Sequence, residues 1–188
     1  MDGEIRQPGG RAPAPGALAL VQAFINTHYD LEDHGGDVFA SPDELECWLA
    51  SRGLLDGDVR LTRRDLARAI TARELLRELA ASDAAGFELL NDVADGATVE
   101  LRFGAGGPRF VPPLRAGLDG ALGVLMAIIA QALRDGSWSR LKVCPGEDCG
   151  WAFYDNSRNQ TGRWCSMSVC GGRAKARAHY RRRRGGEF

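Results

Sequence analysis

Apolar residues recur at intervals of three and four over several stretches of the chain, a spacing that places them on one face of an α-helix. The pattern predicts helices that start near Ala17, at Pro42, after Thr62 and around Phe87, and a longer helix over residues 118–134. Ser41 before Pro42 is typical of a helix start, with serine as the N-cap and proline in the first turn. The helix over 118–134 is apolar almost all round, which predicts burial on most of its sides.

The hydrophobic period changes from helical to alternating between residues 98 and 111. Val99, Leu101 and Phe103 point to one side of a predicted strand, and residues 104–108 are rich in glycine and can turn. Residues 109–111 can return as a second strand. The amino-terminal part is therefore expected to be mostly helical with one small antiparallel β-hairpin.

Composition divides the chain into three parts. A length of 188 residues, 44% of them hydrophobic and 26% charged, suits a medium globular domain followed by a small one. Residues 1–16 are rich in glycine, proline and alanine and predict a disordered leader. We expect the first domain over residues 17–137 and a second, of different character, over residues 138–188.

The net charge of -1 conceals an uneven distribution. Residues 138–188 carry 11 lysines and arginines against 4 acidic residues, whereas the preceding part carries 13 against 21. The basic end is thus the candidate for contact with a polyanion such as nucleic acid.

No stretch of the sequence predicts membrane insertion or secretion. The longest apolar run, residues 121–130, is too short to cross a bilayer and fits a buried helix. The first residues lack the apolar segment of a signal peptide. We expect a cytoplasmic protein, in which clustered cysteines more often bind metal than form disulfides. No phosphate loop, nucleophile elbow or zinc-protease motif occurs, so the sequence does not predict an enzyme.

Four of the five cysteines form two C-x4-C pairs, Cys144 with Cys149 and Cys165 with Cys170. Two short chelating loops can supply the four thiolates of a tetrahedral structural zinc site, which leaves no position for a catalytic water. Two disulfides or four reduced core cysteines are the alternatives. We predict one structural zinc ion per chain, and a buried thiol with a packing role for Cys47.

The residues around these pairs predict a treble-clef-like finger. Residues 151–163 are long enough for a β-hairpin that turns around residues 155–159, and helix-forming residues follow Cys170. Trp151, Phe153 and Trp164 are expected to form a small core over the metal, with base stacking on one of them as the rival role. The predicted fold class is α+β, mostly helical: a helical amino-terminal domain with a small hairpin, then a zinc finger ending in a basic helix.

The helix after Cys170 is strongly basic. Its cations are partly explained by the helix dipole or by a solvated tail. Four consecutive arginines nevertheless repel one another unless an anion compensates, and nucleic-acid phosphates are the usual partner. Arginines near the predicted hairpin are further candidates for nucleic-acid contact. A role in forming the turn would also explain them. The candidate nucleic-acid contacts are Arg158, Arg163, Arg173, Lys175, Arg177, Arg181, Arg182, Arg183 and Arg184.

The finger resembles the CGNR zinc finger family. The segments that carry the resemblance are CPGEDC, FYDNSRN, RWCSMSVC and GRAKARAHYRRR. The family's tetrad has asparagine where this chain has Gly172, and Gly162 stands where a second basic residue before Arg163 is expected. Any phosphate or capping role of those two side chains is therefore missing here.

The amino-terminal part resembles the ABATE domain that precedes this finger, through FINTHYD at residues 24–30 and PDELECWL at residues 42–49. The resemblance implies a stress-induced transcription regulator. Asn26, His28 and Trp48, taken from these segments, are candidates to line a ligand pocket.

Three functions compete at this point. The preferred one is a DNA-binding transcription regulator whose amino-terminal domain senses a small-molecule effector or forms a homodimer. An RNA-binding or ribosome-associated zinc protein is the second, because one basic finger has no feature that specifies DNA. The third is a small-molecule-binding or enzymatic domain whose finger serves only stability.

Overall fold

The computed structural model describes residues 7–29, 36–82, 86 and 88–184. About half of the chain is helical, and the strands of the described part form three separate antiparallel pairs. The helices are η1 (Pro8–Gly10), α1 (Leu18–Ile25), α2 (Pro42–Ala50), α3 (Arg63–Ala81), α4 (Leu89–Ala94), α5 (Gly117–Asp135), η2 (Ser137–Arg140), the π-turn η3 (Met167–Gly171) and α6 (Gly172–Arg184). The strand pairs are β1 (His28–Tyr29) with β2 (Gly36–Asp37), β3 (Glu100–Gly104) with β4 (Gly107–Val111), and β5 (Leu141–Val143) with β6 (Ala152–Tyr154). The predicted fold class is confirmed.

The helix starts predicted near Ala17, at Pro42 and after Thr62 are those of the structure. The start predicted around Phe87 falls on a residue outside the described part, and α4 begins at Leu89. The Ser41 hydroxyl accepts a hydrogen bond from the Glu44 N–H at the start of α2. Thr62 and Asp65 form a reciprocal capping box at the start of α3. Each cap satisfies a backbone N–H that the first turn of a helix leaves without a partner.

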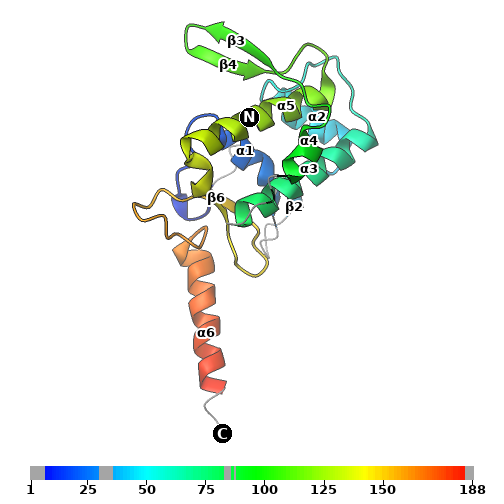
Figure 1. The fold of residues 1–188 in the computed structure, drawn as a ribbon. Helices are drawn as coiled ribbons and strands as arrows, with labels where there is room; N and C mark the ends of the chain where they lie inside the picture. The colour runs from blue at the N-terminus through cyan, green and yellow to red at the C-terminus, as the bar shows by residue number, and fades with distance from the viewer. Residues whose placement is uncertain (1–6, 30–35, 83–85, 87, 185–188) are drawn as a thin grey trace.

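We call the part of the fold that precedes the finger the body. Helix α5 is its central element (Figure 1) and packs against α1, α4 and β4. By length and hydropathy it is the one helix of the described residues that could span a membrane, but 56% of its most apolar window is buried within the fold, as in a core helix. Gly123 allows the chain before β3 to cross it closely, because a Cβ there would lie 2.0 Å from the Thr98 carbonyl oxygen. The predicted burial of this helix on most sides is confirmed.

The β3–β4 hairpin extends beyond the body (Figure 1) and exposes an apolar face. Leu101 pairs with Phe110 and Phe103 with Pro108, so these four side chains share one face. Phe103 is 79% exposed. The alternating pattern predicted the hairpin but not that its apolar side would face solvent.

Helix α2 contributes Trp48 to an aromatic cluster with Phe24 and Phe39, at ring-centroid distances of 5.7 and 5.6 Å. Cys47, which we expected to be buried, is exposed. The reason is the helical period: turning Trp48 and Leu49 into the core places the preceding residue on the outer face.

The amino-terminal segment differs from the disordered leader expected over residues 1–16. Residues 1–6 lie outside the described part, whereas residues 7–16 run over the finger and bury Ala14. We call residues 7–16 the strap. Its polar side chains find partners in the finger that composition could not reveal.

The core crosses the predicted boundary at residues 137 and 138. Trp138, Leu141 and Tyr154 are buried in the main core together with α1, α3 and α5. A second cluster surrounds the cysteines and includes Trp151 and Phe153. The finger is therefore packed into the body along its first strands.

Candidate metal centre and basic helix

The first cysteine pair lies in the turn between β5 and β6. The Cys144 N–H donates to the Trp151 carbonyl at 2.9 Å, and the Cys149 N–H donates to the Gly146 carbonyl at 3.2 Å. A Cβ on Gly146 would lie 3.2 Å from the Cys170 sulfur, so a side chain there would crowd the ligands. Residues 144–149, the knuckle, thus have a backbone shaped around the site.

The hairpin of the finger is not where the sequence predicted it. Strand β6 pairs back with β5 across the knuckle, and described residues 155–165 form no strand. The knuckle itself is the turn, so the later segment 155–159 does not need to supply one.

The second pair lies where a loop enters the last helix. Ser166 caps η3, because its hydroxyl accepts from the Val169 N–H at 3.3 Å. The π-turn carries Cys170 and continues directly into α6. The π-turn that carries Cys170 therefore attaches the basic helix to the metal site.

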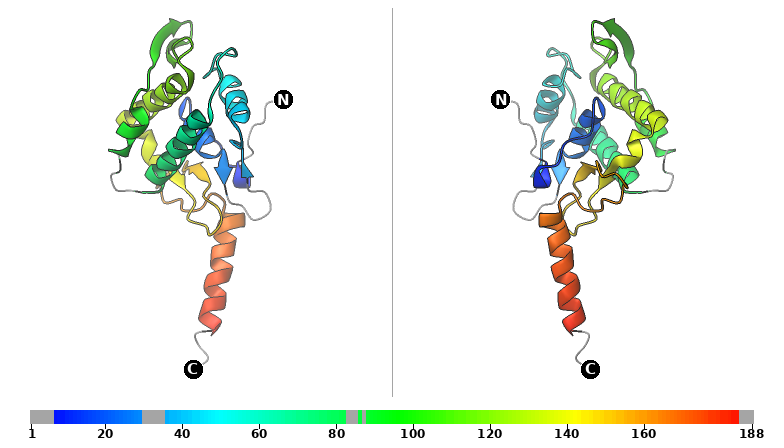
Figure 2. Two further views of the ribbon diagram at one scale, coloured as in Figure 1. Left: turned by 90° about the vertical axis from the view of Figure 1, so that its right-hand side faces the viewer. Right: turned by 90° about the vertical axis from the view of Figure 1, so that its left-hand side faces the viewer.

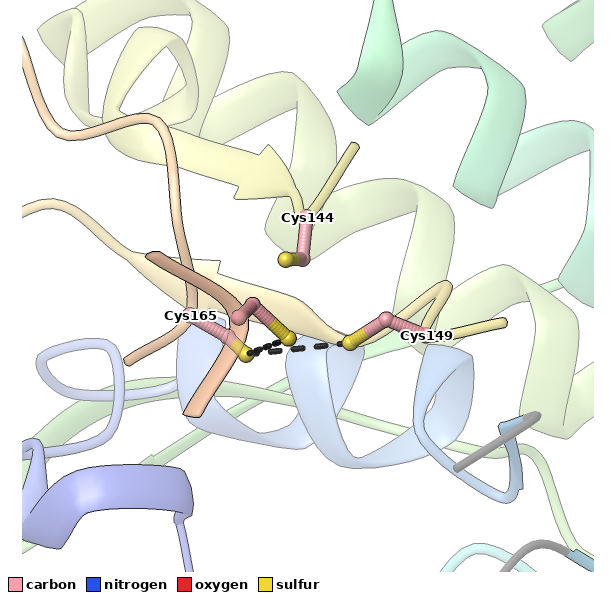
Figure 3. Close-up of side chains that lie close together, drawn as sticks. Cys144, Cys149 and Cys165 are labelled. Carbon is pink, nitrogen blue, oxygen red and sulfur yellow. Dashed lines mark hydrogen bonds between the residues drawn. The ribbon is translucent and has the colours of Figure 1, made fainter. Parts of the chain in front are cut away.

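The four thiols fit a zinc ion. All four sulfurs lie within 4.8 Å of one another and all four residues are buried (Figure 3). Cys165 Sγ lies 3.7 Å from Cys149 Sγ and 3.6 Å from Cys170 Sγ. Tetrahedral thiolates at a Zn–S distance of about 2.3 Å are about 3.8 Å apart, whereas a disulfide requires about 2.05 Å. The cysteines are positioned to hold one structural zinc.

The effects of the thiols on one another's pKa values also favour a bound cation. Hydrogen bonds from the thiols of Cys149 and Cys165 lower the pKa of Cys144 to about 2. Donating to the Cys144 thiolate raises the pKa of Cys149 and of Cys165, since a second thiolate would repel the first. A divalent ion removes this conflict and deprotonates all its thiol ligands.

Helix α6 projects away from the body as a stalk (Figures 1 and 2). Lys175, Arg181, Arg182 and Arg183 are exposed along it, while Arg173 and Arg177 are half-buried near its base. Arg177 pairs with Glu147 of the knuckle at 3.1 Å. The candidates Arg158 and Arg163 lie instead in the loop after β6, where both are exposed.

Two family models match the chain. The model of the ABATE family, described as "Putative stress-induced transcription regulator", matches residues 9–136, and the model of the CGNR zinc finger matches residues 140–183. The chain belongs to the ABATE family. It carries the CGNR finger after the ABATE domain, in the order that the sequence resemblance implied. No curated protein matches the chain.

Asp155 organises the loop between the two cysteine pairs of the CGNR finger. Its buried carboxylate accepts from Lys142 Nζ at 2.8 Å, the Gly162 N–H at 2.8 Å and the Ser157 N–H at 3.0 Å. Burial alone would raise the pKa of Asp155, but these hydrogen bonds hold it well below its usual value. A Cβ on Gly162 would lie 2.8 Å from this carboxyl group, which explains why glycine replaces the expected basic residue.

The strap holds the CGNR finger from outside. Arg11 Nε donates to the carbonyl of the ligand Cys165 at 2.7 Å, and Arg11 Nη2 donates to the Trp164 carbonyl at 3.1 Å. The guanidinium lies 4.9 Å from the Phe153 ring centroid. Gln7 accepts from the Trp151 indole N–H at 3.1 Å. Neither polar residue could be recognised from the sequence, where the only signal is their place in a segment otherwise rich in glycine, proline and alanine.

Residues of α1 and α3 and the residue after α1 also hold the CGNR finger. Asn26 exchanges two hydrogen bonds with the backbone of Ala152, and Gln22 Nε2 donates to the same carbonyl at 3.1 Å. Arg77 donates to the carbonyls of Gly150 and Ile25. This buried polar network joins helices α1 and α3 to the metal-binding hairpin.

The predicted pocket residues have structural contacts instead. Asn26 belongs to the network above, His28 Nδ1 lies 3.7 Å from Glu74 Oε1, and Trp48 packs in the aromatic cluster. None of the three lines the cavity of about 880 Å³ beside α5. Of the three, Asn26 contacts the finger, and Trp48 packs in the main core.

The aromatic residues of the finger form the small core that the sequence predicted. Trp151 and Phe153 are buried against the cysteines, and Trp164 packs at the edge of the cluster. Burial leaves the first two no face for stacking on a base. Trp164, which lines a cleft between the knuckle and α6, retains partial exposure.

Proposed function

We propose that this ABATE protein is a DNA-binding transcription regulator in which the CGNR finger presents α6 to duplex DNA. The observation that carries the proposal is the uncompensated charge of the helix. Lys175, Arg181, Arg182 and Arg183 have no acidic partner within the described part of the chain, and all four are exposed. Phosphate oxygens would supply the missing counter-charge.

The shape of the molecule supports a groove-binding role. Helix α6 has 13 residues and is therefore about 20 Å long. The major groove of B-DNA is about 12 Å wide and admits one helix. Because α6 points away from the acidic remainder of the chain, the negative charge of that part lies far from the duplex.

The two ends of the helix would act differently. Arg173 and Arg177 lie near the metal site, where the folded finger holds their backbone, so they are suited to contact base edges. The exposed ion pair between Arg177 and Glu147 is of a kind worth about 0–1 kcal/mol, so DNA can displace it at little cost. The four arginines at the distal end, residues 181–184, would bind phosphates without regard to sequence.

The test is a fluorescence-anisotropy titration of the zinc-loaded full chain with duplex DNA and matched RNA at several salt concentrations. If residues 181–184 neutralise four phosphates, their contribution to the slope of log K against log salt is about -3.6. Replacing all four by alanine should flatten the slope by that amount and weaken every sequence alike. Replacing Arg173 or Arg177 should instead reduce the preference among sequences, at about 1–3 kcal/mol per lost base contact.

A matched control removes charge from the body. Arg63, Arg64 and Arg134 are exposed on α3 and α5, and replacing them by alanine should leave the slope unchanged. Binding insensitive to salt, or unaffected by the quadruple substitution, would refute the proposal. Tighter binding to RNA than to DNA would replace it with the RNA-binding alternative.

A further inference from the structure

A cavity of about 880 Å³ lies in the ABATE domain, between the start of α1, the turn after α2, strand β4 and the carboxyl-terminal half of α5. Small-molecule sites commonly have volumes of about 300–1,000 Å³. Val124, Ile128, Gln131 and Asp135 line it from α5 at three- and four-residue spacing. They form one stripe about 16 Å long, so the cavity is elongated along the helix.

The walls of the cavity are mainly apolar. Leu20 lines it from α1, Leu54 from the turn after α2, and Phe110 with Val111 from β4. Leu20 and Phe110 are only partly covered by the protein. An apolar chain in the cavity would remove this surface from water, at about 25 cal/mol per Å² buried.

Arg52 gives the cavity a defined charge. Its guanidinium lies 4.0 Å from the centroid of the Trp48 ring, and its Nη1 donates to the Trp48 carbonyl and the Ser51 hydroxyl. Burial lowers the pKa of Arg52 below its usual value. Arg52 lines the cavity and is half-buried, and no carboxylate of the described residues pairs with its guanidinium.

The other charged groups that line the cavity do not cancel Arg52. Arg109 adds a second, exposed positive charge. Asp135 is exposed, and its carboxylate already accepts from the Ser137 N–H at 2.9 Å. Solvent screens an exposed charge far more than a half-buried one. Arg52 therefore determines the sign of the ligand that the cavity favours.

We propose that this cavity binds an amphipathic organic anion, with a carboxylate at Arg52 and an extended apolar chain along the α5 stripe. Guanidinium groups bind carboxylates through two parallel hydrogen bonds, and the apolar walls match a hydrocarbon chain. Binding of such an anion at this cavity does not require nucleic acid, and it can be measured without any.

The experiment is an isothermal calorimetric titration of the zinc-loaded full chain with decanoate, below its micelle concentration, and with decanol. Decanoate should bind saturably at one site per chain, and decanol should bind at least about tenfold more weakly because it lacks the charge. Arg52→Gln should abolish that difference, and Arg52→Lys should retain part of it. Arg134→Gln, an exposed change on α5 outside the cavity, should alter neither affinity.

A second variant tests the chain-binding part of the cavity. Leu20 is half-buried at the wall, so Leu20→Trp should fill the space and prevent binding of both probes while thermal unfolding confirms a folded protein. Absence of saturable decanoate binding, equal affinity for the two probes, or undiminished binding by folded Arg52→Gln or Leu20→Trp would overturn the proposal. Should Arg52→Gln fail to fold, the probe comparison and Leu20→Trp still decide it.

Discussion

The side-chain amide of Asn26 pairs with the backbone of Ala152 through two hydrogen bonds of 2.8 Å each. Its Nδ2 donates to the carbonyl and its Oδ1 accepts from the N–H, as a neighbouring strand would do. The two residues are 126 positions apart, one after α1 and one in β6. A buried amide of the ABATE domain thus completes the hydrogen bonding of the metal-binding hairpin.

Replacing Asn26 by leucine should destabilise the protein by about 1–3 kcal/mol, the cost of a buried backbone group without a partner. It removes the partner of the Ala152 N–H, whereas the Ala152 carbonyl keeps its hydrogen bond from Gln22. Asn26→Asp should also destabilise it, because a carboxylate oxygen would face the Ala152 carbonyl. Urea unfolding of the zinc-loaded protein measures both effects. Asn91→Asp on the exposed side of α4 is the control and should stay within about 0.5 kcal/mol. Equal stability of Asn26→Leu and the parent would show that the pairing contributes nothing.

One zinc ion per chain should be found by elemental analysis, bound through thiolates only. Structural zinc in small fingers contributes about 10–16 kcal/mol of binding free energy, so a chelator should unfold the segment around the cysteines. Hydrogen exchange should then rise at the knuckle and η3 while amides of α3 and α5 remain protected, because the main core is separate from the cysteine cluster.

The cysteine variants provide the control for zinc binding. Cys170→Ser should lose the metal, and Cys47→Ser should retain it, since Cys47 lies on the exposed face of α2. Protein that is carefully prepared yet free of metal, or disulfides among the four ligands under reducing conditions, would rule out the zinc site.

Asp155 should contribute stability that depends on pH. Its folded pKa is held below the usual value, so its contribution is fully present above the unfolded pKa of about 4 and disappears as pH falls through the lower folded pKa. Asp155→Asn should therefore be less stable than the parent near neutral pH, and the two should converge in acid. The difference between the two unfolding curves is the measurement, because zinc affects both alike. Asp95→Asn, an exposed change, should give a difference independent of pH.

The two glycines that depart from the CGNR pattern should respond differently to substitution. A Cβ at Gly172 would make an ordinary contact of 3.6 Å with the Met167 carbonyl, and the residue has helical φ and ψ of -64° and -47°. Gly172→Asn should therefore change stability by less than about 0.5 kcal/mol. Gly162→Lys should cost about 1–3 kcal/mol, because its Cβ would displace the Asp155 carboxylate. Thermal unfolding distinguishes them, and equal melting temperatures would contradict this account.

The features that could be predicted from the sequence are those fixed by near neighbours. The side chains of Ser41 and Thr62 cap helices by accepting hydrogen bonds from the N–H groups of residues three positions away. Each C-x4-C pair places its two thiols in one short loop. The partners of Arg11 and Asn26 could not be predicted, since no periodicity relates residues more than 100 positions apart. The cavity was also missed, because it arises where α1, β4 and α5 meet.

The strap makes the folding of the finger depend on both ends of the described chain. Arg11 bonds to Trp164 and Cys165, which follow it by 153 and 154 residues. Contacts of such long sequence separation form late, because the entropy of closing the loop is lost before the contact is gained. During synthesis Arg11 leaves the ribosome well before Cys165 is added to the chain. Its guanidinium therefore remains solvated until the residues that carry its partners have emerged. Docking of the strap therefore requires synthesis of the finger at least as far as Cys165.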